Sequence, residues 1–109
     1  MSVHISDADF KAYANDGVVL IKNLLTADEV VDLRAGIDEN ISNPSSRSKV
    51  ASVEKDPGWF LEDVCTWQEN PANERIIFES QISEVAAKLM CSEQVRLYHD
   101  HMLVKKSGT

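Results

Sequence analysis

The fold is decided by the stretch VRLYHDHMLVKKSGT, which occupies residues 95–109. Residues 95–105 contain β-branched, aromatic and aliphatic side chains and neither Gly nor Pro, so the pattern predicts one long strand there. Side chains alternate between the two faces of a strand, so the odd-numbered residues share one face and the even-numbered residues share the other. The odd-numbered face therefore carries both histidines, His99 and His101, together with Leu103.

Upstream of this strand the sequence predicts four helices. Three run over residues 7–15, 27–42 and 71–78, and the fourth begins after Ser80 and carries Ile82, Val85, Ala86 and Leu89 on its buried stripe. Each has apolar residues at helical spacing and a residue before it that can cap the N-terminus. The expected N-caps are Ser6, Thr26, Asn70 and Ser80. Thr26 and Glu29 form a capping box, and Pro71 suits the first helical position after Asn70. We expect the fourth helix to end at Cys91-Ser92, where Gly would be more usual.

Two segments between the helices have other characters. Residues 18–21, VVLI, follow directly after Asp16-Gly17 and predict a buried strand. Residues 43–58 are polar and rich in turn-forming residues, so we expect one long loop. The acidic pair Glu62-Asp63 is interpreted as solvated surface.

The composition limits the classes of protein to which the chain can belong. It has 109 residues with 43% hydrophobic side chains, which suits one domain, and 11 basic against 18 acidic residues give a net charge of −7. Nucleic-acid binders need basic patches, so no nucleic-acid partner is expected. Two cysteines, no signal-like segment and no long apolar run indicate a soluble, cytoplasmic protein without a membrane partner.

His99 and His101 are the residues best suited to bind a metal ion. On a strand their Cβ atoms would lie about 7 Å apart on one face, at a rise of ~3.3 Å per residue. A functional site needs at least a third ligand, and no other candidate stands at a recognisable spacing. The favoured interpretation is therefore that both rings line a pocket and form hydrogen bonds. A metal site completed across a dimer is the less favoured alternative.

Several of these features, taken in order, resemble the N-terminal part of phytanoyl-CoA dioxygenase-like proteins. The first half contributes DGVVLI (16–21), LLT (24–26) and a capped helix with LR (33–34). The second half contributes WF (59–60), Trp67, NP (70–71) and a strand that ends in LVKKSGT (103–109). Ser107 stands where proline is common in the family, and Cys91 stands where glycine is common. The resemblance covers almost the whole chain.

The resemblance implies an Fe(II)- and 2-oxoglutarate-dependent oxygenase that hydroxylates a small organic substrate. Its fold class is α+β, with N-terminal helices and the first strands of a double-stranded β-helix, or jelly roll, that is incomplete in this chain. Residues 1–109 would form a single domain, the N-terminal part of that scaffold.

The family holds its iron with an H-x-D motif and a distal His, and grips 2-oxoglutarate with an Arg. All of these lie beyond the lysine-x-proline-glycine-threonine turn, and His99-Asp100-His101 has the wrong order to be the H-x-D motif. We therefore expect no catalytic residue, no metal ligand and no bound cofactor in this chain alone. We also expect it to be inactive by itself.

The resemblance assigns four residues to the pocket. His101 would approach the cosubstrate together with Lys105, which matches the lysine of the family's turn, and His99 and Trp67 would lie on the substrate side. Ordinary interior packing is an equally supported alternative for these side chains. The alternative function is a small interaction protein built on the half-fold, which would form a homodimer through exposed strand edges.

Overall fold

In a computed structural model, the described residues, 4–108, form four helices and a three-stranded antiparallel sheet. The elements in chain order are α1 (Asp7–Asp16), α2 (Ala27–Ser42), β1 (Lys49–Val50), β2 (Phe60–Val64), α3 (Pro71–Glu79), α4 (Ile82–Leu89) and β3 (His101–Lys105). The strands are ordered β1-β2-β3 in the sheet. The predicted α+β class is therefore confirmed, whereas the jelly-roll scaffold stays a prediction.

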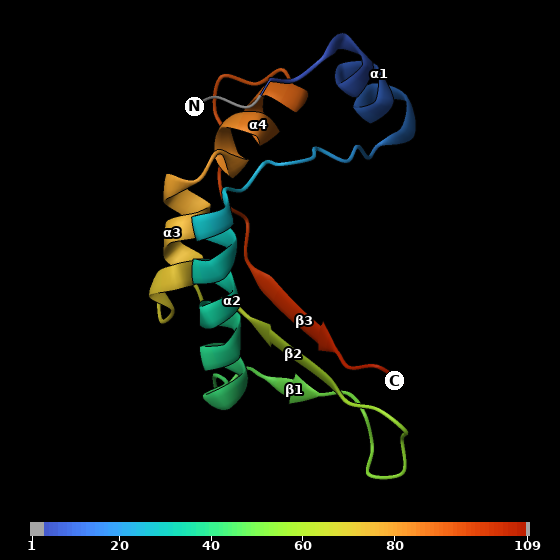
Figure 1. The fold of residues 1–109 in the computed structure, drawn as a ribbon, viewed down its shortest axis with the longest axis vertical. Coiled ribbons are helices and arrows are strands. Elements are labelled where there is room, and N and C mark those ends of the chain that lie inside the picture. Colours follow the sequence, from blue (N-terminus) through green and yellow to red (C-terminus); the bar gives the residue numbers. More distant parts are fainter. Residues whose placement is uncertain (1–3, 109) are drawn as a thin grey trace.

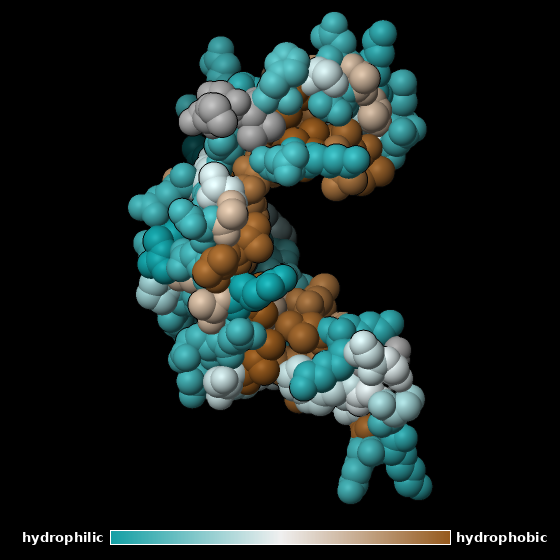
Figure 2. Space-filling view, in the orientation of Figure 1, coloured by the Kyte–Doolittle hydropathy of each residue, from teal (hydrophilic) through white to brown (hydrophobic). Residues whose placement is uncertain are grey.

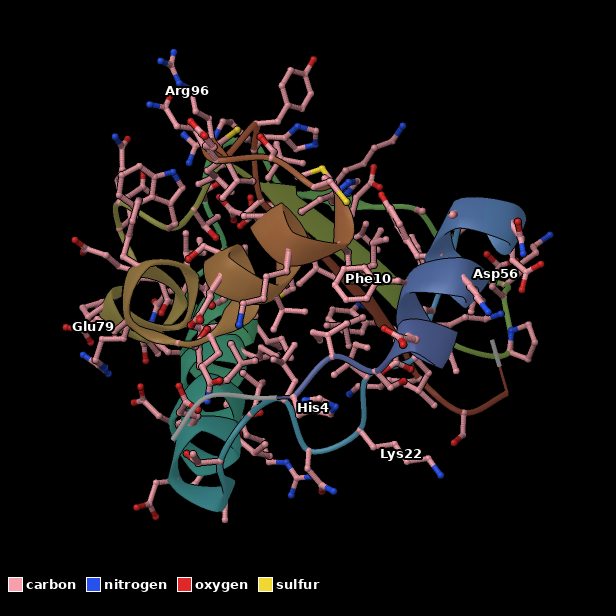
Figure 3. The ribbon with its side chains drawn as sticks, turned by 90° about the horizontal axis from the view of Figure 1, so that it is seen from above. His4, Phe10, Lys22, Asp56, Glu79 and Arg96 are labelled. Carbon is pink, nitrogen blue, oxygen red and sulfur yellow. The ribbon has the colours of Figure 1, made fainter. Side chains whose placement is uncertain are left out.

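The described chain is elongated and curved. Its radius of gyration is 16.2 Å and its extents are 47 × 29 × 25 Å, whereas a compact domain of about 100 residues has a radius near 13 Å. Helices α2 and α3 run side by side along one flank of the sheet, and α1 and α4 lie together at the other end of the molecule (Figure 1). Phe10 points from α1 toward α4 (Figure 3). Apolar surface gathers on the inner side of the curve (Figure 2).

The first three helices start as the sequence predicts. The Ser6 side chain accepts from the Asp9 amide at 3.1 Å, and the Thr26 side chain accepts from the Glu29 amide at 3.1 Å. In both cases the acidic side chain accepts from the backbone N–H of the capping residue, which completes a capping box. Asn70 caps α3 by accepting from the next amides along the helix.

Two of the helices, α1 and α4, end in left-handed backbone, and one predicted cap is wrong. Gly17 closes α1 at φ 75°, and Cys91 follows α4 at φ 52°, in the conformation that glycine usually supplies. Ser80 is the C-cap of α3 rather than the N-cap of α4, which is Gln81. The physical reason is that the Ser80 hydroxyl donates to the carbonyl of Ile76, one turn back.

Helices α2 and α3 approach closely where a glycine faces an alanine. A Cβ atom added at Gly36 would lie 2.5 Å from the Ala72 Cβ and 3.0 Å from Asn70 Oδ1. Asn70 Nδ2 also donates to the Gly36 carbonyl at 2.8 Å. On the outer side, Arg75 forms a bidentate pair with Asp32 at 2.8 and 2.7 Å, and the guanidinium lowers the pKa of the Asp32 carboxyl.

The strand expected over residues 18–21 does not form. These residues are extended, but no strand of the described chain pairs with them, and Val18 and Leu20 are 69% and 76% exposed. The segment links α1 to α2 at the end of the molecule away from the sheet (Figure 1). A strand needs a neighbouring strand with which to form backbone hydrogen bonds, so the apolar character of residues 18–21 was not sufficient to make them a strand.

The C-terminal strand is shorter than predicted, because it covers residues 101–105 and not residues 95–105. Its partner β2 ends at Val64, and the next residue, Cys65, still donates its N–H to the Asp100 carbonyl at 3.0 Å. Cys65 has φ 57°, so the backbone turns away beyond that bond. Asp100 then uses its carboxylate to hold that turn, through the amides of Thr66 and Trp67. The ladder between β2 and β3 therefore ends at Asp100, whose side chain accepts the next backbone hydrogen bonds.

The stretch between α2 and α3 holds two strands that the sequence analysis missed. β1 interrupts the expected loop, and β2 pairs with it in the register Lys49↔Glu62. β2 pairs with β3 in the register Leu61↔Val104 and Asp63↔Met102. Asp63 is 0% exposed, so its interpretation as solvated surface is wrong. It lies on the same face of β2 as buried Leu61, because residues two apart point to the same side.

The close approach of α2 and α3 predicts that Gly36→Ala destabilises the chain. The new methyl group would overlap the Ala72 side chain, and such overpacking costs about 1–3 kcal/mol. Urea denaturation followed by circular dichroism measures the loss. Adding Ala72→Gly removes the blocking methyl group and is expected to restore part of the stability. Equal stability of Gly36→Ala and the wild type would contradict this packing.

Candidate functional site

The best-ordered cluster of polar side chains surrounds the Asp63 carboxylate. Oδ2 accepts from Asn40 Nδ2 at 2.9 Å and from the Ser45 backbone N–H at 2.7 Å. Oδ1 accepts from the Ser45 hydroxyl and from the Val64 N–H at 2.9 Å. The carboxylate thus joins α2, the turn that follows it and β2.

No cation of residues 4–108 forms an ion pair with Asp63. Burial by itself raises the pKa of this carboxyl, because it disfavours the charged form. The hydrogen bonds from Ser45, Asn40 and Val64 act in the opposite direction and outweigh burial, so the pKa of Asp63 lies below its ordinary value. Neutral donors therefore keep a charged group inside the molecule.

A second carboxylate, Asp100, anchors the chain that leads into β3. It accepts from the Thr66 N–H at 3.1 Å, from the Thr66 hydroxyl at 3.0 Å and from the Trp67 N–H at 3.3 Å. Thr66 is buried and also accepts from Asn73 of α3 at 3.2 Å. Asp100 thereby fixes the position of the residues on either side of it, His99 and His101.

Arg47 closes the end of β2 from the outside. Its guanidinium donates to the carbonyl oxygens of Val64 and Cys65 at 3.0 and 3.1 Å and pairs with Glu69 at 3.2 Å. These carbonyls have left the strand ladder and need other donors. The end of β2 is thus held by Arg47 and Asp100 together.

The sheet has two different faces. The face with Leu61 and Asp63 is buried at β2, where Asp63 bonds across to Asn40 of α2, whereas Val50 of β1 on the same face is 51% exposed. On the opposite face, Glu62 Oε2 lies 3.3 Å from His101 Nε2, and Leu103 is 57% exposed. This second face, which also carries Phe60, Val64 and Lys105, is called the open face below.

A small cavity of about 200 Å³ lies between α2, α3 and the start of β3. It is mainly apolar, and its walls are Leu33, Ile37, Asn73, Ile76, Ile77, Asp100, His101 and Met102. Of the four residues expected in the pocket, only His101 borders this cavity. The cavity lies on the helix side of the sheet, whereas the His101 side chain pairs with Glu62 on the open face.

The structure brings the expected site residues together only in part. The rings of His99 and His101 are 6.4 Å apart between centroids, but His99 precedes β3 and does not belong to it. Trp67 is half-buried and packs edge-on against Phe78 at 5.0 Å. Lys105 lies at the far end of β3, opposite Phe60.

Residues 4–108 contain neither a group of side chains ready to hold a metal ion nor a helix able to span a membrane. No group of three or more His, Cys, Asp or Glu residues in this range could hold a metal ion. None of the helices in the same range has the length and apolar character needed to cross a bilayer.

The spacing of Asn40 and Asp63 in the sequence is a signal for the Asp63 cluster, which the sequence prediction missed. Asn40 continues the stripe of Leu33 and Ile37 along α2 at helical spacing, so it occupies a position that faces the interior. Asp63 follows Leu61 at strand spacing. A polar residue at an interior position of both a helix and a strand indicates a buried hydrogen-bonded pair, and this signal was available in the sequence.

Comparison of the chain with protein-family models, with curated proteins and with solved structures gives no match.

The Asp63 cluster predicts a large, pH-dependent effect of Asp63→Asn. At neutral pH the amide cannot accept every hydrogen bond of the carboxylate, and the loss is expected to be about 2–3 kcal/mol. The folded-state pKa lies below the unfolded value of about 3.9, so the stabilisation is present at neutral pH. The stabilisation is lost as the pH falls from the unfolded-state pKa through the folded-state pKa.

Urea denaturation at a series of pH values measures this effect. The difference between the wild type and Asp63→Asn is expected to shrink as the medium becomes acidic. Asp38→Asn, on the exposed side of α2, is the matched control and is expected to leave the stability unchanged at every pH. A difference for Asp63→Asn that is independent of pH would contradict the role given to the carboxylate charge.

Proposed function

We propose that this chain forms the N-terminal layer of a phytanoyl-CoA dioxygenase-like, Fe(II)- and 2-oxoglutarate-dependent oxygenase that hydroxylates a small organic substrate. In this proposal the sheet is one wall of a double-stranded β-helix, and α2 and α3 cover its outer side. The open face would line the pocket for cosubstrate and substrate. The chain supplies this wall and is not catalytic by itself.

The observation that carries the proposal is the difference between the two faces of the sheet. One face is covered by helices and fixed by the buried Asp63 carboxylate. The open face carries the half-buried Phe60 and Val64, the exposed Leu103 and the His101–Glu62 pair. A sheet that closes against a second sheet presents inward-facing residues of this mixed character.

On the open face, His101 and Lys105 have the chemistry to bind a dicarboxylate. The Glu62 carboxylate holds the His101 ring in place through Nε2 at 3.3 Å. Lys105 lies on the same face, since strand residues four apart point to the same side. His101 and Lys105 lie at opposite ends of β3, about 13 Å apart along the strand. In this proposal the Lys105 ammonium receives a carboxylate of 2-oxoglutarate by a charge-assisted hydrogen bond, and the His101 imidazole faces the same pocket.

Asp100 connects the two residues proposed for the substrate side. His99 directly precedes Asp100 in the chain, and the Trp67 amide donates to the Asp100 carboxylate. The indole of Trp67 packs edge-on against Phe78 of α3, which limits the conformations available to the indole. We infer that Asp100 sets the position of both rings relative to His101.

Residues 4–108 do not supply a complete iron site. A facial triad needs two His and one carboxylate with suitable geometry, and the described residues contain no such group of three. The His101–Glu62 pair offers only two donors. We therefore assign the iron ligands to other sequence and derive no chemical step here.

Fragment complementation tests this proposal. The chain is combined with the iron-binding remainder of a phytanoyl-CoA dioxygenase-like oxygenase, cut directly after its lysine-x-proline-glycine-threonine turn. We expect conversion of 2-oxoglutarate to succinate by the mixture and none by either part alone. Lys105→Ala is expected to raise the KM for 2-oxoglutarate about tenfold, the cost of one charge-assisted hydrogen bond.

Lys22→Ala is the matched control, because Lys22 is an exposed lysine on the 17–26 segment outside the sheet. It is expected to leave the KM unchanged. Succinate production by the chain alone would overturn the claim that it is not catalytic. Two folded parts that neither associate nor turn over 2-oxoglutarate would overturn the family proposal.

A further inference from the structure

The outer edge of β3 is a docking surface of defined geometry. β3 is the last strand of the sheet order β1-β2-β3, and no strand of residues 4–108 pairs with its other side. Figure 1 shows β3 at the margin of the sheet that faces away from α2 and α3. An edge strand offers unpaired N–H and C=O groups, which bind readily to another extended chain.

The hydrogen bonds next to β3 establish which of its residues bond to β2. The Lys106 N–H donates to the Trp59 carbonyl at 3.0 Å, and the Cys65 N–H donates to the Asp100 carbonyl at 3.0 Å. Backbone groups of an antiparallel strand turn to alternate sides at successive residues. Because Asp100 and Lys106 both bond to β2, the even-numbered residues between them do so as well.

The odd-numbered residues of β3 therefore turn their backbone groups to the outer edge. These residues are His101, Leu103 and Lys105, with Leu103 at the centre of the five-residue strand. Their side chains all lie on the open face, and each of the three is exposed. The edge thus presents three regularly spaced N–H and C=O pairs around one exposed leucine.

We propose that a second copy of this chain occupies this edge, and that β3 pairs antiparallel with the partner's β3 about a two-fold axis at Leu103. In this register each outward residue has a partner, because Leu103 lies opposite the partner's Leu103 and His101 lies opposite the partner's Lys105. The two sheets become one continuous sheet. An interface of this kind is isologous, as in most homodimers.

The side chains on both faces support a second copy as the occupant. On the open face the two Leu103 side chains meet at the axis, and on the opposite face Met102 lies beside the partner's Val104. The partner's Lys105 arrives next to the His101–Glu62 pair, so each copy brings an ammonium group toward a carboxylate of the other. Registers centred on His101 or Lys105 would instead place like side chains with ionisable groups opposite each other.

This inference shares His101 and Lys105 of the open face with the oxygenase proposal but does not rest on it, because it is argued from the unpaired outer edge of β3 and the pairing register. Light scattering with size-exclusion chromatography at pH 8 is expected to give twice the 12.2 kDa of one chain. In amide hydrogen exchange, Met102 and Val104 are expected to be protected at every concentration. His101, Leu103 and Lys105 are expected to gain protection only as the chain concentration rises.

Leu103→Pro is the decisive variant. Proline removes an N–H that points to the outer edge, so the bonds between β2 and β3 within one chain remain. We expect a monomer with the wild-type circular dichroism spectrum and a dimer Kd raised about thirtyfold or more, because two hydrogen bonds are lost across the axis. Leu103→Lys is a second variant with the same expected result, in case the proline disturbs the strand.

Leu20→Lys is the matched control, because it removes an equally exposed leucine that is remote from the sheet. It is expected to leave the dimer intact. A wild-type chain that remains monomeric at submillimolar concentration would overturn the proposal. A dimer that survives both Leu103 variants, or one without concentration-dependent protection of the odd-numbered amides, would overturn it as well.

Discussion

The rest of this structure depends on one buried charge, the Asp63 carboxylate. Its two oxygen atoms accept hydrogen bonds from Asn40, Ser45 and Val64, and no solvent reaches it. A charge in the interior is costly unless donors surround it, and the donors here come from α2, the following turn and β2. The position of the longest helix relative to the sheet is therefore set by a polar contact of fixed geometry. Apolar burial alone would allow the helix to slide.

This dependence on polar contacts follows from how little apolar surface the chain buries. The buried apolar residues are Ile5, Leu61, Ala72, Ile76 and Val85, and the buried polar ones are Asn40, Asp63, Thr66, Asn70 and Ser80. One class is as large as the other. A core of this kind orders the side of the sheet beneath the helices and leaves the open face and the outer edge of β3 available for binding. The pocket wall and the dimer edge that we propose are two consequences of the same arrangement.

The parts of the fold that depend on neighbours in the chain were predictable from the sequence. The capping residues Ser6 and Thr26 and the left-handed position at Gly17 act within a few residues, and the helices follow from them. Strands depend on partners that are distant in the chain, and here the prediction held only for the C-terminal part of residues 95–105, which forms β3. The VVLI segment has strand-like residues but no strand among residues 4–108 to pair with, and β2 went unrecognised because it contains two charged residues, Glu62 and Asp63. Helix caps depend on residues close together in the sequence, whereas strand pairing depends on residues that only the whole fold brings together.

The candidate site was likewise predictable from the sequence only in part. Of residues 99–101, the strand position of His101 was predictable, and His101 lies beside Glu62, whereas His99 precedes the strand. The task of Asp100 was not predictable, because it holds Thr66 and Trp67, more than thirty positions away. Asp63 differs, because its spacing from Leu61 and the position of Asn40 indicated a buried pair, but the acidic pair Glu62-Asp63 was interpreted as surface. Adjacent carboxylates on a strand point to opposite faces, so one of them bonds to an imidazole on the open face and the other lies in the interior.

The central claim is that hydrogen bonds keep the Asp63 carboxylate charged inside the folded chain. The most direct measurement is an NMR titration of its side-chain carboxyl carbon in the folded protein. The structure predicts that this carbon titrates below the ordinary aspartate value of about 3.9. A titration at or above that value would mean that burial outweighs the donors, and it would contradict the role of Asp63 as the anchor of the fold.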